Sequence, residues 1–314
     1  MALPALRALR CGLPEARIVV VGRWAGLLAG QGVADVLLGH PPGLGDRLRL
    51  ARHLRASRPD VAVVLPNSFE SALAARAWGA AVRIGFAADA RDGLLTARVP
   101  LPAPRAHQVD EYAMLVAALG LAVAERVPRW ERGTAPDAQG EVQGLLAAAG
   151  CGPGGRLVGL HVGSALGGAK LWPAASFARL AVALRRTGLV PLLLGAPGDA
   201  GTAAAVGRAA GTPVASLVGR DRPALLPAVL TRIGCLVSGD TGVAHLAAAL
   251  GVPTVTLFGP TDPARSAPRG AAARVVVGAA PCAPCFLTRC PIDHECLRAV
   301  SVAAVARQVA EAAR

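Results

Sequence analysis

The chain has 314 residues, enough for two domains, and 53% of them are hydrophobic. No apolar stretch reaches the roughly 20 residues of a membrane span, and arginines interrupt the first apolar stretch, where a signal peptide would lie. A formal net charge of +13 favours an anionic partner, but only 3% of residues are aromatic and could stack on bases, so we expect no nucleic-acid binding. We predict a cytoplasmic protein without a cofactor.

Strands and helices alternate along the whole chain. Short β-branched or apolar runs predict strands at 17–22, 61–65, 82–85, 157–162, 190–195, 235–238 and 254–258. Helical patterns fall at 46–58, 68–78, 107–120, 138–149, 174–187, 200–210, 222–231 and 243–250. This rhythm is typical of parallel βαβ units, so the predicted class is α/β.

The composition changes between residues 126 and 154, where Pro, Gly, Glu and Ala gather. We predict an N-terminal domain at 1–135 and a C-terminal domain at 136–314. Both would be doubly wound, and ligands of such sheets bind at the carboxyl ends of the strands.

The strongest motif runs from Ser238 to Pro253, where a strand ends in a polar turn and a helix begins. The backbone amides at Thr241 and Gly242 would bind a diphosphate at the helix N-terminus, and Asp240 would hold a sugar hydroxyl or the turn. We also place His245 among the donor-binding residues. In the alternative interpretation, Asp240 or Thr241 only caps the helix and His245 packs in the core.

A second motif, Gly163–Pro173, also joins a strand to a helix. Its glycines would let backbone amides approach an anion, Ser164 would donate a hydroxyl, and Lys170 would supply a positive charge. It is no P-loop, because Leu171 follows the lysine. The alternative is a flexible loop with a solvated lysine.

A third motif, Leu65–Leu73, places Asn67 and Ser68 at the start of a helix. Either residue could cap that helix, and either could contact an acceptor.

Together these motifs resemble the lipopolysaccharide heptosyltransferases of glycosyltransferase family 9, heptosyltransferase II in particular. The similarity includes Arg83–Phe86, Arg91–Thr96 and Phe258–Thr261. It covers nearly the whole chain in the family's order.

The resemblance implies a GT-B fold, two Rossmann-like domains facing a cleft, and an inverting transfer of L-glycero-D-manno-heptose from ADP-heptose to the lipopolysaccharide inner core. Lys170, on the donor phosphates, and Asp240 are then the catalytic candidates. The donor-binding set is Gly163, Ser164, Lys170, Asp199, Asp240, Thr241, Gly242 and His245. Asp199 would hold the adenosine ribose, although an aspartate of a surface turn fits the sequence equally well.

The implied acceptor is a lipid A that carries Kdo and heptose, reached by a protein lying peripherally on the inner face of the cytoplasmic membrane. The candidate acceptor-binding residues are Asn67, Ser68, Arg83, Arg91 and His107. Each arginine could equally be an ordinary surface charge.

The chain departs from the family at its start, where the family has a strand and a Gly-Asp loop before a helix like Met1–Arg10. The first strand of the N-terminal domain, and with it the aspartate that serves the family as general base, is missing from the chain as given. We interpret this as a start assigned too late; an inactive protein or another base is the alternative. Gly239 and residues 220–223 also differ from the family pattern.

Four of seven cysteines gather near the C-terminus, at Cys282, Cys285, Cys290 and Cys296. They could hold a structural metal, but their spacing is not that of a zinc ribbon, and we expect reduced thiols in a compact loop. Three alternatives to heptose transfer stay open: a non-catalytic or inactive sugar-nucleotide-binding homologue, a transferase for another nucleotide sugar, and a nucleic-acid- or metal-binding module.

Overall fold

The computed structural model describes residues 1–88, 90–131, 136–164, 167–220 and 223–312. The chain forms two compact units, Met1–Pro128 and Arg129–Arg314, which we call the first and the second unit. We predicted the boundary between residues 135 and 136. Trp130 already belongs to the second unit, where its backbone N–H donates to the Ala249 carbonyl at 2.8 Å.

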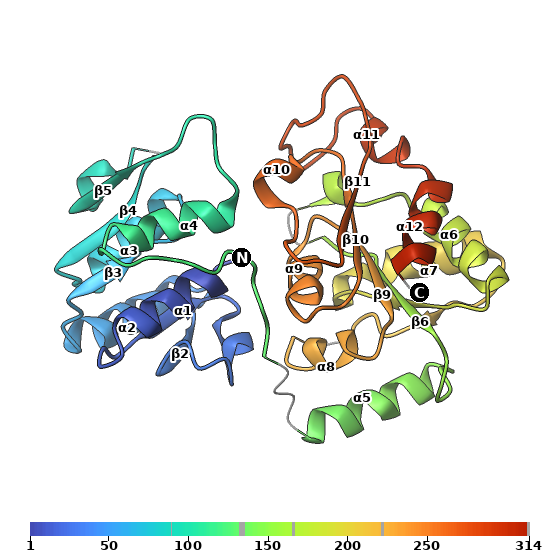
Figure 1. Ribbon diagram of the computed structural model, residues 1–314, viewed down its shortest axis with the longest axis horizontal. Helices are drawn as coiled ribbons and strands as arrows, with labels where there is room; N and C mark the ends of the chain where they lie inside the picture. Colours follow the sequence, from blue (N-terminus) through green and yellow to red (C-terminus); the bar gives the residue numbers. More distant parts are fainter. Residues whose placement is uncertain (89, 132–135, 165–166, 221–222, 313–314) are drawn as a thin grey trace. The chain divides into compact units, whose positions relative to one another are not determined.

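The second unit is built on one parallel sheet of six strands, in the order β11-β10-β9-β6-β7-β8. Figure 1 labels β11, β10, β9 and β6 of this sheet. The strands are β6 (Leu157–His161), β7 (Val190–Leu194), β8 (Ala215–Ser216), β9 (Cys235–Gly239), β10 (Thr254–Phe258) and β11 (Ala273–Val277). Every residue of β6, β9 and β10 is buried, as is typical of central strands covered on both faces. The predicted parallel α/β architecture is confirmed.

Helices pack on both faces of this sheet. One hydrophobic core joins it to α6 (Ala174–Arg186), α7 (Ala200–Ala210) and α12 (Val302–Ala312), and the other joins it to α5 (Pro136–Ala148), α8 (Leu226–Leu230) and α9 (Gly242–Ala249). In α6, Phe177, Leu180 and Leu184 recur at helical spacing and are all buried. The short helices α10 (Pro263–Ser266) and α11 (Glu295–Arg298) and the 3-10 turns η3 (Gly168–Lys170) and η4 (Pro197–Asp199) complete the unit.

The order of the strands places a topological switch between β6 and β9. From β6 the chain moves outward through β7 to β8, and it then returns to β9 on the other side of β6. The loops that leave β6 and β9 therefore diverge at the carboxyl edge of the sheet. Open α/β sheets bind their ligands at such a point.

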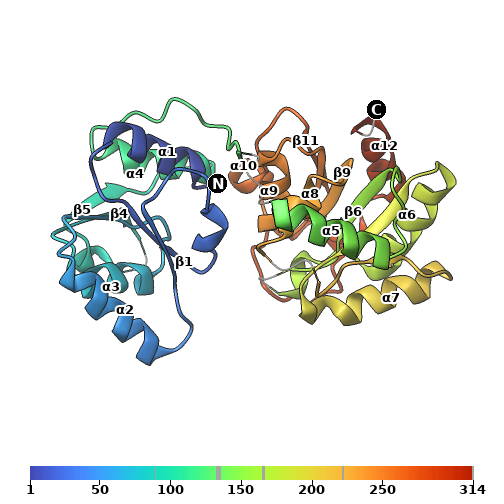
Figure 2. The ribbon, with the colours of Figure 1, turned by 90° about the horizontal axis from the view of Figure 1, so that it is seen from below.

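The first unit contains two parallel sheets. One pairs β1 (Val19–Gly22) with β2 (Val36–Gly39), and the other has β3 (Val61–Val63), β4 (Val82–Ala87) and β5 (Ala97–Pro100). Its helices are α1 (Leu3–Gly12), α2 (Leu44–Ala56), α3 (Phe69–Ala77) and α4 (Gln108–Ala117), with 3-10 turns η1 (Ala25–Leu28) and η2 (Asp92–Leu94). Figure 2 shows α1 and α4 on one side of the unit and α2 and α3 on the other. Among the described residues, no helix is both long and apolar enough to cross a membrane.

Candidate active site

The two predicted catalytic residues meet at the switch point of the second unit. Lys170 lies in the loop after β6, residues 163–173, which we call the lysine loop, and Asp240 lies directly after β9. The Lys170 Nζ donates to Asp240 Oδ2 at 2.7 Å and to the Asp240 carbonyl at 3.4 Å. The two side chains are only 14% and 8% exposed, so water screens this pair less than a surface pair.

Lys170 is the only lysine in the chain, and the other 32 of its 33 lysine and arginine residues are arginines. A lysine is a compact point charge, whereas an arginine is a planar fork that pairs with planar groups. The single lysine of this arginine-rich chain is the residue whose side-chain nitrogen lies at the switch point.

A buried polar chain lies beneath the ion pair. His161, the last residue of β6, has its Nδ1 3.4 Å from Ser238 Oγ, which in turn lies 2.9 Å from Thr241 Oγ1. Burial lowers the pKa of His161 from 6.5 to about 4, so its ring is neutral at pH 7. Sequence reasoning missed this histidine, although its place at the end of an apolar strand was a signal.

The N-terminus of α9 lies directly beside the Lys170–Asp240 pair. Thr241 is its N-cap residue, but the Thr241 side chain makes no capping bond to the helix backbone. Its hydroxyl pairs with Ser238 instead. The alternative that Thr241 only caps the helix is therefore wrong, and the first amides, from Gly242 onward, can bind an anion. His245 is half-buried one turn into α9, and its contact with a donor stays a prediction.

Close backbone packing at two glycines shapes the lysine loop. A Cβ atom on Gly239 would lie 2.8 Å from the Lys170 carbonyl oxygen, so the end of β9 can approach the loop this closely only without a side chain. A Cβ atom on Gly163 would lie 2.1 Å from Asp199 Oδ2. Asp199 also accepts the Ala196 N–H at 2.8 Å, and its carboxylate thus lies beside the loop.

Ser164 Oγ is buried and has no hydrogen-bond partner among the described residues. Residues 165 and 166 of the predicted motif lie outside those residues. At the other end of the loop, Trp172 is 2% exposed and packs edge-on against Phe177, with ring centroids 5.1 Å apart. This contact fixes the end of the lysine loop to α6.

The candidate acceptor residues of the first unit have structural contacts. Ser68 is the N-cap of α3 and accepts the Ser71 N–H, and His107 caps α4 by accepting the Val109 N–H. The Arg83 Nε donates to the Leu94 carbonyl at 2.7 Å. For these three residues, contact with an acceptor stays a prediction.

Arg91 requires a correction, because its side chain is completely buried. Its guanidinium donates to the carbonyls of Phe86, Pro66 and Ser68, and Nη2 lies 3.4 Å from Asn67 Oδ1. A fully buried side chain has no surface for an acceptor, so Arg91 instead fixes the turn that carries Asn67 and Ser68.

The C-terminal cysteines lie close to one another in the part of the chain that the structure describes, without the arrangement of a metal site. Among the described residues, no three His, Cys, Asp or Glu side chains are arranged to hold a metal ion. All seven thiols are free, and Cys296 is buried. The cysteines nevertheless lie in a segment that contacts the lysine loop, as described below.

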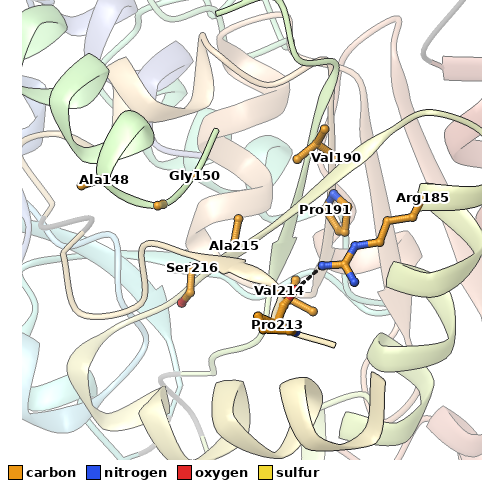
Figure 3. A pocket seen from close by; sticks show the side chains of 10 residues that line it. Ala148, Gly150, Arg185, Val190, Pro191, Pro213, Val214, Ala215 and Ser216 are labelled. Carbon is orange, nitrogen blue, oxygen red and sulfur yellow. Dashed lines mark hydrogen bonds between the residues drawn. The ribbon is translucent and has the colours of Figure 1, made fainter. Parts of the chain in front are cut away.

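A hollow of about 330 Å³ lies elsewhere in the second unit, as Figure 3 shows. It is lined among others by Gly150, Arg185, Pro191 and Ser216, at the amino ends of β7 and β8. Arg185 already donates to Thr212 and to the Pro213 carbonyl. Because ligands of parallel sheets bind at the carboxyl ends, we assign the site to the switch point and not to this hollow.

The comparisons with known proteins point to a single family. The sequence profile of glycosyltransferase family 9 (heptosyltransferase) matches residues 47–295. Lipopolysaccharide heptosyltransferase 2 of Salmonella typhimurium strain LT2 is 31% identical over 250 residues, 74% of this chain and 69% of that protein. The protein of the same name from Escherichia coli K12 is 30% identical over the same shares.

Two solved structures share the fold over 99% of this chain. The ADP-heptose lps heptosyltransferase II of E. coli superposes with a TM-score of 0.79 at 24% identity, over 94% of its own chain. The family 9 glycosyltransferase of Veillonella parvula superposes with a TM-score of 0.81 at 21% identity, over 92% of its own chain. The predicted two-domain GT-B type of fold is confirmed.

Proposed function

The chain belongs to glycosyltransferase family 9 and is a glycosyltransferase, and we propose that it transfers L-glycero-D-manno-heptose from ADP-heptose to the inner core of lipopolysaccharide, with inversion of the anomeric centre. The observation that carries this proposal is the meeting of Lys170 and Asp240 at the β6–β9 switch point. The names of the similar heptosyltransferases point to ADP-heptose and lipopolysaccharide, and the motif resemblance implies the configuration of the heptose and the inner core.

In this proposal the second unit binds the donor. The diphosphate lies between the Lys170 ammonium and the first amides of α9, and Asp199 accepts hydrogen bonds from the ribose. Negative charge grows on the diphosphate as the glycosidic bond breaks. A fixed cation and a helix N-terminus stabilise that charge more in the transition state than in the ground state.

Asp240 has two roles in the proposed cycle. Before the donor binds, its carboxylate holds Lys170 Nζ at 2.7 Å and keeps the ammonium oriented at low exposure. When the diphosphate binds, the ammonium lies between two anionic groups, and Asp240 also accepts a hydroxyl of the sugar. The acceptor hydroxyl attacks the opposite face of the anomeric carbon and loses its proton to a general base.

The direct test is a transfer assay with ADP-heptose and a heptosyl-Kdo lipid A acceptor, read by mass spectrometry of the acceptor. It is run on the 314-residue chain and on the chain extended upstream by the family's first strand and Gly-Asp loop. We expect a heptose-sized mass gain on the acceptor. No gain with either protein, at donor concentrations that saturate binding, would contradict the proposal.

We also propose that the enzyme works on the cytoplasmic side, bound peripherally to anionic lipid. Large apolar side chains are exposed on α2 and α3, at Leu44 (72%), Leu48, Phe69 and Leu73. The Arg47–Glu70 ion pair joins the two helices, and α2 contains four arginines. Exposed apolar groups beside basic residues are typical of surfaces that bind anionic bilayers.

Vesicle co-sedimentation tests this surface. We expect binding to vesicles with anionic lipid, weaker binding to zwitterionic vesicles, and loss of binding in the double variant Leu48→Ser, Phe69→Ser. Equal binding of both proteins to anionic vesicles would rule out this surface.

A further inference from the structure

The cysteine-rich part of the chain, residues 282–296, contacts both structures that hold the Lys170–Asp240 pair. We call it the cysteine segment. One of its neighbours is the lysine loop. The other is the turn 259–262 with the helix α10 behind it, whose Ser266 hydroxyl donates to Asp240 Oδ2 at 3.3 Å.

Two hydrogen bonds join described residues of the lysine loop to the cysteine segment. The Ala169 N–H donates to the Thr288 carbonyl at 3.2 Å, and His294 Nε2 lies 2.9 Å from the Gly168 carbonyl oxygen. A carbonyl can only accept, so His294 carries its proton on Nε2. Gly167 has φ +101°, and a Cβ atom there would lie 2.5 Å from the Thr288 oxygen. The residues just before Lys170 are thus packed directly on the segment.

The same segment is attached to the turn before α10. The Phe286 N–H donates to the Pro260 carbonyl at 2.7 Å, and the Arg265 guanidinium lies 4.9 Å from the centre of the Phe286 ring. A Cβ atom on Gly259 would lie 2.8 Å from the Cys296 sulfur. The cysteine segment therefore links the structure that holds Lys170 to the structure that holds Asp240.

The segment holds His294 in a demanding backbone conformation. His294 has φ +58°, in the left-handed region that Asn, Asp and His adopt more readily than most residues. Its backbone N–H donates to the Cys290 sulfur at 3.2 Å. Burial raises the pKa of Cys296, a backbone hydrogen bond at Leu297 opposes that shift, and the neighbouring Cys282, Cys285 and Cys290 add to it, consistent with four thiols gathered around one compact loop.

We propose that the cysteine segment is part of the donor site and that His294 is a positioning residue for Lys170, acting through the Gly168 carbonyl. Gly168 and Lys170 belong to the same 3-10 turn, η3, so a shift of the Gly168 carbonyl moves the lysine backbone. The proposal rests on the proposed function only in that the ligand of Lys170 is a diphosphate.

The single lysine makes the test specific. Protein labelled with ε-¹³C-lysine gives one side-chain NMR signal, which reports on Lys170 alone. In His294→Asn the new residue still tolerates the left-handed backbone conformation, but the side-chain amide is too short to reach the Gly168 carbonyl. In His294→Gln the longer amide restores the reach. His53→Asn, at an exposed position of α2, is the matched control.

We expect His294→Asn to shift the Lys170 signal and to raise the donor KM about fivefold, with kcat and the acceptor KM within about twofold, because one hydrogen bond is lost. His294→Gln should restore the Lys170 signal and the donor KM most of the way to their wild-type values. His53→Asn should change neither of them. An unchanged Lys170 signal in His294→Asn, or equal shifts in the Asn and Gln variants, would overturn the proposal. The NMR readout needs no donor, so an absence of heptose transfer by every protein would count against the proposed function and not against His294.

Discussion

The two units use their polar side chains for different purposes. In the second unit, Lys170, Asp240 and Ser238 leave neighbouring strands and converge at the carboxyl edge of one continuous sheet. In the first unit, the guanidinium groups of Arg91 and Arg83 donate to backbone carbonyls of neighbouring segments, those of Pro66 and Leu94 among them. A motif can therefore mark a ligand site or a folded turn, and the partner of the side chain decides which.

The largest effect that we expect comes from removing the buried guanidinium group of Arg91, which has a structural role in the first unit. Arg91→Met should lower the stability of the first unit by about 3 kcal/mol, because buried carbonyls lose a charged donor. Hydrogen exchange of β4 and α3 amides would measure this loss, with the second-unit strands as an internal reference. Arg49→Met, at a side chain that is 75% exposed, should leave exchange unchanged. Slow exchange retained in Arg91→Met would refute the structural role.

The next change removes function from the second unit while leaving its fold intact. Asp240→Asn should lower kcat/KM for heptose transfer about 100-fold, because Lys170 loses the carboxylate that orients it. Asp262→Asn is the matched control, since Asp262 caps α10 through the Ala264 N–H and Asn caps equally well. If both variants lose activity to the same extent, Asp240 has no special place in the site.

A pH series sharpens the comparison at His161. Its pKa is lowered to about 4 by burial, so between pH 6.5 and 4 only the unfolded chain takes up this proton, and stability falls as the pH falls. The loss at pH 5 relative to pH 7.5 should be about 2 kcal/mol. Urea unfolding of wild type and His161→Asn at both pH values measures this loss of stability. The variant should lack the part of the loss that comes from His161. Identical pH dependence in the two proteins would show that His161 is not buried as a neutral ring.

The smallest expected effect concerns the approach of β9 to the lysine loop. Gly239→Ala adds a methyl group 2.8 Å from the Lys170 carbonyl, so the loop must shift, and we expect the donor KM to rise about tenfold. Gly207→Ala in α7 has no neighbour within 4 Å and should keep the donor KM while stabilising the helix slightly. A normal donor KM in Gly239→Ala would mean that the packing of the loop is not needed for binding.

The sequence predicted the elements whose pattern is local. The apolar runs of β6, β7, β9 and β10 and the helical spacing of α6 are each contained in a short window, and all were found within a few residues of their predicted ends. Strand β8 has two residues and could not give a pattern. The predicted helix at 222–231 is observed as α8, Leu226–Leu230, and residue 222 lies outside the described residues.

The sequence predicted several residues of the candidate site but not the contacts that these residues make. Lys170 and Asp240 lie 70 positions apart, and they meet only because β9 pairs with β6 after the chain has passed through β7 and β8. The burial of Arg91 depends on the turn after β3 and the end of β4 lying together, which no spacing in the sequence specifies. The same is true of His294, whose partner Gly168 lies 126 positions away.

The central claim is that the second unit binds a nucleoside diphosphate at the single lysine of the chain. Calorimetric titration of ADP into wild type and Lys170→Arg tests it most directly, because the substitution keeps the charge and changes only its shape. We predict saturable binding at one site in wild type and at least a tenfold weaker Kd in Lys170→Arg. Equal affinities in the two proteins, or no binding of ADP to wild type, would contradict the claim.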